Sequence, residues 1–170
     1  MTTLRTARML TRYNAWANEM MFNAVAKLPP GEAMGRRCSL FPNIVHTLNH
    51  NYVIGLIFQA HLLGQEHGFA ARNTPTCPPL DELWHAQREV DNWYIAWSDG
   101  LTDAALEETV GFTFVGGGEG AMTRAEILLH IVNHTTYHHG FVADLFYQIP
   151  AEPPTTDLPV FRRDVPLKLE

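Results

Sequence analysis

The sequence predicts an all-α fold, a four-helix bundle, and three observations carry that prediction. Four long segments place apolar residues at the three- and four-residue spacing of a helix face. Clusters of proline and glycine separate these segments, and both residue types interrupt helices. Alternation typical of a strand occurs in one short stretch, so strand content should be minimal. The chain of 170 residues is expected to form a single domain, 1–170.

The first three helices are predicted from apolar spacing and from the residues that end each segment. The first is expected over residues 10–28, because the sequence PPG directly afterwards stops the helical pattern. The second is expected over 42–63, with Ser39 as a candidate cap near its start. The third is expected over 80–98, after the breaker-rich sequence NTPTCPP.

The fourth helix has the clearest start, because a capping box precedes it. Thr123 and Glu126 are spaced so that the hydroxyl and the carboxylate can each accept a hydrogen bond from a free backbone amide. This helix is expected over 123–148. The stretch TVGFTFVGGGEGAMT before it predicts a short hairpin or a loop. The tail from Ala151 contains several prolines and is expected to lie extended on the bundle.

Composition excludes several classes of function. Net charge is −6 with a pI near 5.8, and the basic residues are scattered, which argues against nucleic-acid binding. There is no run of about 18 apolar residues and no secretory signal, so no membrane association is expected. The glycine cluster is followed by Ala121-Met122 where a phosphate-binding loop needs Lys-Ser or Lys-Thr. Cys38 and Cys77 form no CxxC motif, which favours a reducing, cytoplasmic location.

Regularly spaced histidines distinguish the fourth predicted helix. His130, His134 and His138 recur every four residues and share one helix face with apolar neighbours such as Ile127 and Ile131. A buried imidazole without partners costs about 1–3 kcal/mol, and several adjacent ones need several partners. One divalent cation would satisfy them together. The spacing alone leaves the ligand pair open between 130/134 and 134/138.

A third metal ligand has to come from another helix. His46 and His50 are again four residues apart and share a face with Ile54, while His61 lies on the same side three turns further along. Other templates fit less well: one Glu-x-x-His match falls short of a di-iron centre, and no HExxH or GxSxG motif occurs. The remaining alternative is a bare helical bundle whose histidines bond internally. No general base or other catalytic residue is identified.

Several segments together resemble one family. RYNAWANEMMFNAV in the first helix, TLNH in the second and HIVNHTTYHHGFVADLF in the fourth are similar to the DinB/YfiT-like metalloenzymes. The closing PPTTDLPVF resembles the tail of DinB-type members, and all four matches occur in the family's order. Tyr13, Asn14 and Trp16 of the first motif are expected to serve core packing, with a hydrogen bond from the asparagine.

The resemblance implies an up-down-down-up four-helix bundle, often dimeric, in which three histidines hold one divalent metal ion. The ligands it implies are His50 of the Leu-Asn-His segment together with His134 and His138. His130 becomes a flanking residue. His139 stands where the family commonly has arginine, so no role of that arginine is carried over.

The resemblance also implies chemistry. It favours a metal-dependent hydrolase or a thiol-dependent transferase that acts on an unknown small molecule, with a low-molecular-weight thiol as a candidate co-substrate. The alternative is a non-catalytic metal-binding protein of a stress response. Three imidazoles accept nickel, zinc or iron, so the identity of the metal stays open. A homodimer is expected, because Leu128, Val132 and Phe146 make a second side of the fourth helix apolar.

Overall fold

The computed structural model describes residues 2–166 and is predominantly helical. The predictions of an all-α class and of little strand are confirmed at this level. Eight elements follow one another along the chain: α1 (Leu4–Val25), α2 (Ile44–Leu62), α3 (Leu80–Asp99), α4 (Asp103–Leu106), β1 (Thr109–Thr113), β2 (Glu119–Thr123), α5 (Arg124–Phe146) and α6 (Leu158–Asp164).

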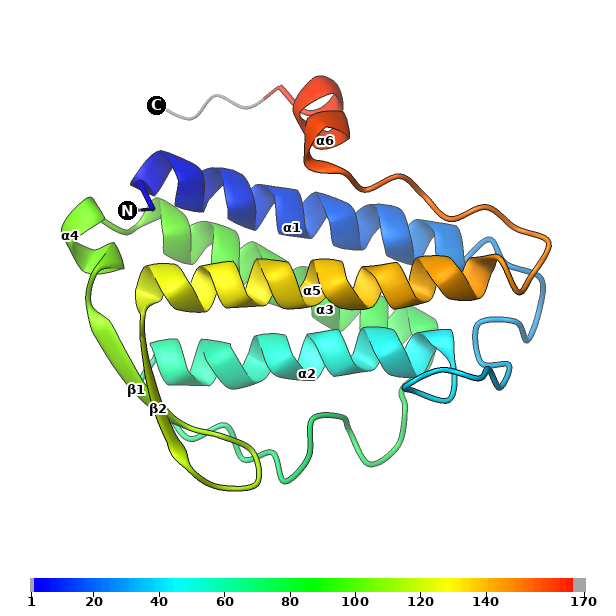
Figure 1. The fold of residues 1–170 in the computed structure, drawn as a ribbon, viewed down its shortest axis with the longest axis horizontal. Helices are drawn as coiled ribbons and strands as arrows, with labels where there is room; N and C mark the ends of the chain where they lie inside the picture. The colour runs from blue at the N-terminus through cyan, green and yellow to red at the C-terminus, as the bar shows by residue number, and fades with distance from the viewer. Residues whose placement is uncertain (1, 167–170) are drawn as a thin grey trace.

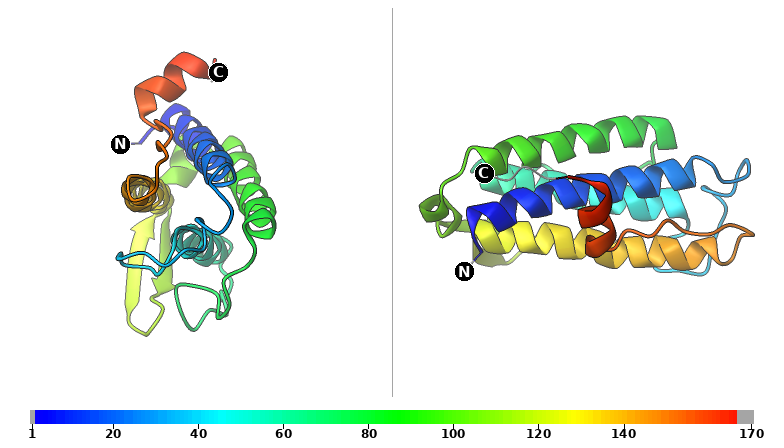
Figure 2. Two further views of the ribbon diagram at one scale, coloured as in Figure 1. Left: turned by 90° about the vertical axis from the view of Figure 1, so that its right-hand side faces the viewer. Right: turned by 90° about the horizontal axis from the view of Figure 1, so that it is seen from above.

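Four long helices lie side by side (Figure 1). Helices α1 and α5 run in one direction, and α2 and α3 run in the opposite direction (Figure 1). Each of the four packs against two of the others, with contacts in the pairs α1–α3, α2–α3, α2–α5 and α1–α5. The end-on view in Figure 2 shows the same square arrangement, with the hairpin beside α5 and α2. Within the described residues, no helix has both the length and the apolar character needed to cross a membrane.

Side-chain caps fix where the helices begin. The side chain of Asn43 accepts a hydrogen bond of 2.8 Å from the backbone amide of His46, so Asn43 caps α2 and the prediction of Ser39 was wrong. The predicted capping box of α5 is confirmed. Thr123 Oγ1 accepts from the amide of Glu126 at 3.2 Å, and Glu126 Oε2 accepts from the amide of Thr123 at 2.7 Å.

Replacing Thr123 with alanine should lower the free energy of unfolding by about 1 kcal/mol, because the amide of Glu126 loses its acceptor. Urea unfolding followed by circular dichroism measures this difference. Thr113→Ala is the matched control, since Thr113 is an exposed threonine of the same hairpin and caps no helix. Equal losses in both variants would contradict the assigned role of the cap.

The hairpin before α5 is present as expected. β1 pairs with β2 in antiparallel register, from Thr109 opposite Thr123 to Thr113 opposite Glu119. The connection contains Gly116, Gly117 and Gly118, all at φ between 93° and 99°, where residues with a Cβ are strained. The short helix α4, which precedes the hairpin, was not predicted.

The tail is not extended throughout, so that prediction was wrong for residues 158–164, which form α6. Phe161 of α6 is fully buried, and its ring lies 5.6 Å from that of Tyr13 and 5.4 Å from that of Trp16. The Tyr13 hydroxyl donates to the carbonyl of Thr156 at 2.9 Å. The tail is therefore held on α1, and the prediction that Tyr13 and Trp16 serve packing is confirmed.

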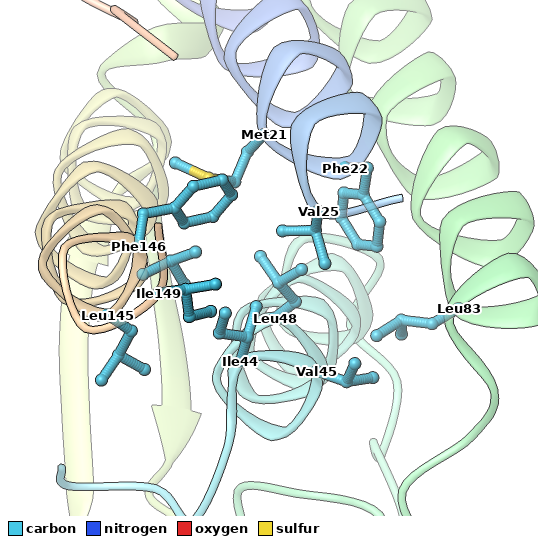
Figure 3. Close-up of a cluster of buried hydrophobic side chains, with 11 residues drawn as sticks. Met21, Phe22, Val25, Ile44, Val45, Leu48, Leu83, Leu145, Phe146 and Ile149 are labelled. Atoms are coloured by element: carbon cyan, nitrogen blue, oxygen red, sulfur yellow. The ribbon is translucent and has the colours of Figure 1, made fainter. Parts of the chain in front are cut away.

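Two apolar clusters inside the four helices leave a polar layer between them. One cluster joins the end of α1, the start of α2 and the end of α5, and Figure 3 shows Met21, Leu48 and Phe146 pointing into it. The other lies near the hairpin and includes Val53, Val90 and Ile127. Between them all four helices contribute buried polar side chains: Asn14, Asn18, His50, Asn51, Gln87, Asp91, Thr135 and His138. Burying polar groups in the middle of a core is costly, so this layer is where function is sought.

Candidate metal centre

Three of the predicted histidines converge between α2 and α5. His50 comes from α2, and His134 and His138 come from α5. One ring nitrogen of each lies within 4.8 Å of the others. The ring centroids are 4.9 Å apart for 50–134, 4.6 Å for 50–138 and 4.5 Å for 134–138. The geometry therefore brings together the histidines that the resemblance implied.

A backbone carbonyl fixes the orientation of His50. Its Nδ1 lies 2.6 Å from the carbonyl oxygen of Arg72, and a carbonyl can only accept, so Nδ1 carries the proton and donates. The lone pair of Nε2 is thereby directed at the cluster, 3.1 Å from Nε2 of His134. Metal-binding histidines characteristically donate their other ring nitrogen to such a carbonyl, which sets the tautomer.

The nitrogen separations suit one small divalent ion. Two nitrogens bound to a tetrahedral ion at about 2.0–2.1 Å lie roughly 3.4 Å apart. The 3.1 Å between the Nε2 atoms of His50 and His134 is close to that value, and the 4.8 Å limit on the cluster leaves a small adjustment for His138. The donor set of three imidazoles thus fits one divalent ion after a small adjustment of the His138 ring.

Burial keeps the three rings neutral. It lowers the pKa of His134 to about 3, with the neighbouring His138 and His50 lowering it further. Burial, together with His50, lowers the pKa of His138 to about 4. The pKa of His50 is also lowered by burial, although its hydrogen bond to Arg72 acts in the opposite direction. At neutral pH all three rings present lone pairs rather than protons, as metal binding requires.

The other predicted histidines stay outside the cluster. His46 stacks on Phe41 with ring centroids 5.5 Å apart. His130 packs on Phe58 at 4.7 Å and stands 5.6 Å from His134. His61 lies further along α2, against His67 and Phe112. The structure thus distinguishes the three histidines of the cluster from the histidines outside it, a choice that periodicity alone left open.

Phe41 is a site residue that sequence reasoning missed. Its ring lies 4.7 Å from the ring of His50 and 5.8 Å from that of His138, so it forms an apolar wall beside two of the three nitrogens. It precedes α2 in an irregular segment. No periodic pattern reaches that segment, so the sequence gives no signal for this contact.

A buried carboxylate was missed as well. Asp91 of α3 is 4% exposed and accepts hydrogen bonds from Asn18 Nδ2 at 3.0 and 3.1 Å and from Gln87 Nε2 at 3.0 Å. Burial raises the pKa of Asp91 to about 7, although the amides of Asn18, Gln87 and Asn14 oppose the shift. A signal existed: Asp91 stands on the face of α3 that Leu83 and Tyr94 bury, where an apolar residue is expected.

A small cavity connects this carboxylate with the cluster. Its volume is about 10 Å³, enough for one water molecule, and its walls include Asp91, Gln87, Asn51 and His134. Three polar atoms at this cavity have no hydrogen-bond partner among the described residues: Nδ2 and Oδ1 of Asn51, and Oε1 of Gln87. The polar layer thus continues from α3 to the back of the histidine cluster.

The sequence pattern of the DinB family matches residues 1–165, which is nearly the whole chain. The chain belongs to the DinB family. It is also 27% identical over 145 residues to Protein DinB of Bacillus subtilis (strain 168), an alignment that covers 82% of this chain and 83% of that protein. The resemblance found in the motifs of α1, α2 and α5 is therefore confirmed at the level of the DinB family.

His139 is a buried histidine of α5 that lies outside the cluster. Its side chain is 3% exposed, and its Nε2 has no hydrogen-bond partner among the described residues. Burial lowers the pKa of His139 to about 4, with His138 as a further cause, so the ring is neutral at pH 7. The ring of His139 therefore supplies no positive charge beside the cluster at neutral pH.

Proposed function

We propose that this chain is a metal-dependent enzyme of the DinB family, in which His50, His134 and His138 hold one divalent ion. The reaction we propose is hydrolysis or thiol-dependent transfer on a small molecule. We further propose that the four long helices form the up-down-down-up bundle of the family. The histidines accept nickel, zinc or iron, with preference set by ligand type and metal supply.

One observation supports the metal more than any other. Three neutral imidazoles from two helices meet in the polar layer, and a carbonyl orients one of them. Internal bonding is the competing explanation: it accounts for the 3.1 Å contact between Nε2 of His50 and Nε2 of His134, but it leaves Nδ1 of His138 without a hydrogen-bond partner among the described residues. A shared cation accounts for all three rings together.

Each chain residue at the site has a role that follows from its contacts. The three imidazoles hold the ion, and the carbonyl of Arg72 fixes the ring of His50. Phe41 covers one side of the rings and limits the access of water. An ion held by three neutral ligands supplies a Lewis acid and lowers the pKa of a coordinated water or thiol.

The second candidate is a non-catalytic metal-binding protein of a stress response. One observation favours it: the cluster of the described residues includes no carboxylate and no thiol beside the three histidines. Such a group would serve as a general base within direct reach of the ion. Turnover of a substrate decides between the two candidates.

A homodimer in the cytoplasm remains part of the proposal, with altered support. Leu128, Val132 and Phe146, on which the expectation was based, are buried within the chain itself. Leu129 and Tyr137 of α5 are 44% and 62% exposed and are the apolar side chains that a second copy would cover. Light scattering tests this, and a monomeric mass contradicts it.

Elemental analysis of protein purified without a His-tag or added metal tests the proposed site. The parent should carry about one divalent ion per chain, and His50→Ala should carry none. His46→Ala is the matched control, because His46 lies one turn away on the same helix and stacks on Phe41. It should keep the ion.

Activity is then measured on esters, amides and thiol conjugates, with and without the ion. Turnover that depends on the ion supports the enzyme, whereas a full complement of metal without turnover favours the second candidate. A parent protein that contains no metal and takes up none would overturn both.

A further inference from the structure

A small apolar cavity lies beside the histidine cluster. Its volume is about 70 Å³, and it is enclosed by α2, the hairpin and residue 72 of the loop after α2. The apolar part of its wall consists of Ile54, Ile57, Phe58, Phe112, Phe114 and Val115. Ile54 stands one helical turn from His50 on α2, and Phe58 contacts His130, the neighbour of His134. None of the three cluster histidines lines the cavity, but its wall begins one helical turn from His50 and includes Arg72, whose carbonyl accepts from the His50 ring.

A wider groove continues from this cavity towards the surface. Its volume is about 510 Å³, and it shares His61, Phe112 and Thr113 with the cavity. A ligand with a body of a few carbon atoms can thus enter along the groove and bury an apolar end near the cluster.

Arg72 is the single charged residue of the cavity wall at neutral pH. Its side chain is exposed, and no described residue forms a hydrogen bond or an ion pair with its guanidinium group. The backbone carbonyl of Arg72 lies 2.6 Å from Nδ1 of His50, which places the residue beside that ring. Among the described residues, the cavity wall contains no carboxylate and no second cationic side chain.

The backbone around Arg72 is held in place. Its carbonyl accepts from Nδ1 of His50 at 2.6 Å, and the next two residues are bonded to α2 as well. Asn49 Nδ2 donates to Asn73 Oδ1 at 3.1 Å and to Thr74 Oγ1 at 2.8 Å. The loop thus holds the backbone of Arg72 beside His50, so a ligand that pairs with the guanidinium has to order the side chain but not the loop.

We propose that Arg72 and this cavity form the ligand subsite of the centre, and that the ligand is a small organic monocarboxylate with an apolar body. This inference rests on the proposed function for its reacting centre. The carboxylate pairs with the guanidinium fork, and the apolar body lies against Phe58 and Phe112. One cation without further donors suits a single negative charge, whereas a phosphate dianion needs several donors.

Benzoate and its neutral counterpart benzamide test the subsite by titration calorimetry on the metal-loaded protein. Arg72→Gln should weaken benzoate binding by about tenfold or more, because a charge-assisted pair is lost. Benzamide should bind the parent more weakly than benzoate and should not respond to the substitution. Arg5→Gln is the matched control, since Arg5 is an exposed arginine of α1 away from the cavity. Its affinity for benzoate should equal that of the parent.

Metal content measured on the same samples separates the two proposals. Arg72→Gln should retain the parent's metal, since Arg72 contacts His50 through its backbone carbonyl. If no sample holds an ion, the proposed function fails, and the preference for benzoate over benzamide is then read on the metal-free protein. Benzoate affinity that is unchanged in Arg72→Gln, or a parent that binds benzamide as tightly as benzoate or binds neither, overturns the inference about Arg72.

Discussion

Addition of a saturating divalent ion should stabilise the parent protein against unfolding by about 4 kcal/mol when the free ion exceeds its dissociation constant a thousandfold. His134→Ala should gain almost nothing under the same conditions. The reason is that the three ring centroids form a nearly equilateral triangle, 4.5 to 4.9 Å on a side, so His134 supplies one of only three ligands in the cluster. Its loss leaves two ligands on different helices. Urea unfolding with nickel or zinc, and with a chelator, measures the gain.

His130→Ala is the control for this experiment, because His130 lies one turn before His134 on the same helix and outside the cluster. It should keep the full gain. The gain should also persist below pH 6.5, since burial lowers the pKa of all three ligands below the ordinary histidine value of 6.5. An equal gain in His134→Ala and the parent would remove the histidine from the proposed ligand set.

The second large effect concerns Asp91 and pH. Its pKa is about 7 in the folded state and close to 3.8 in the unfolded chain. Between pH 3.8 and pH 7, Asp91 is protonated in the folded protein and ionised in the unfolded chain. A rise in pH therefore lowers the free energy of unfolding through Asp91. Above pH 7 both states are ionised, and the whole cost, about 4 kcal/mol, is present. Below pH 4 both are protonated, and the cost is absent.

Asp91→Asn should remove this dependence. Urea unfolding of the parent and the variant from pH 5 to pH 8 should show the variant gaining several kcal/mol relative to the parent. The buried histidines lower the stability as the pH falls below 6.5, which is opposite to the effect of Asp91. They do so equally in the parent and the variant, so the difference between the two free energies of unfolding does not contain their effect. Asp99→Asn is the control: Arg12 lowers the pKa of Asp99, so it is ionised throughout this range in both states. Parallel curves for the parent and Asp91→Asn would contradict the prediction.

Local patterns predicted the four long helices and either a hairpin or a loop before the fourth, because each of these depends on neighbours in sequence. The capping box of Thr123 and the periodic apolar faces involve residues three or four apart, which a linear pattern records. The same patterns left His46 and His50 equivalent. Which of the two joins the cluster depends on how α2 is rotated against α5 and on where Phe41 packs, and neither of these is a local property of the sequence.

Contacts at long range account for the rest of what was missed. The carbonyl of Arg72, in the loop after α2, meets His50 across 22 positions of the chain, and a backbone group carries no sequence signal. Asp91 could have been found, because a carboxylate on the buried face of α3 breaks the apolar pattern. Helix α6 had a weaker signal in Asp157 followed by proline in the first turn, which the other prolines of the tail obscured.

The proposed ligands on α2 and α5 lie far apart along the chain, and this has a consequence for biosynthesis. His50 and His134 are 84 positions apart, so a nascent chain displays the first ligand long before the others leave the ribosome. In the proposed centre, an ion could be captured only once α5 is complete and docked on α2. Such an ion would mainly slow unfolding and would do little to guide the earlier assembly of the helices.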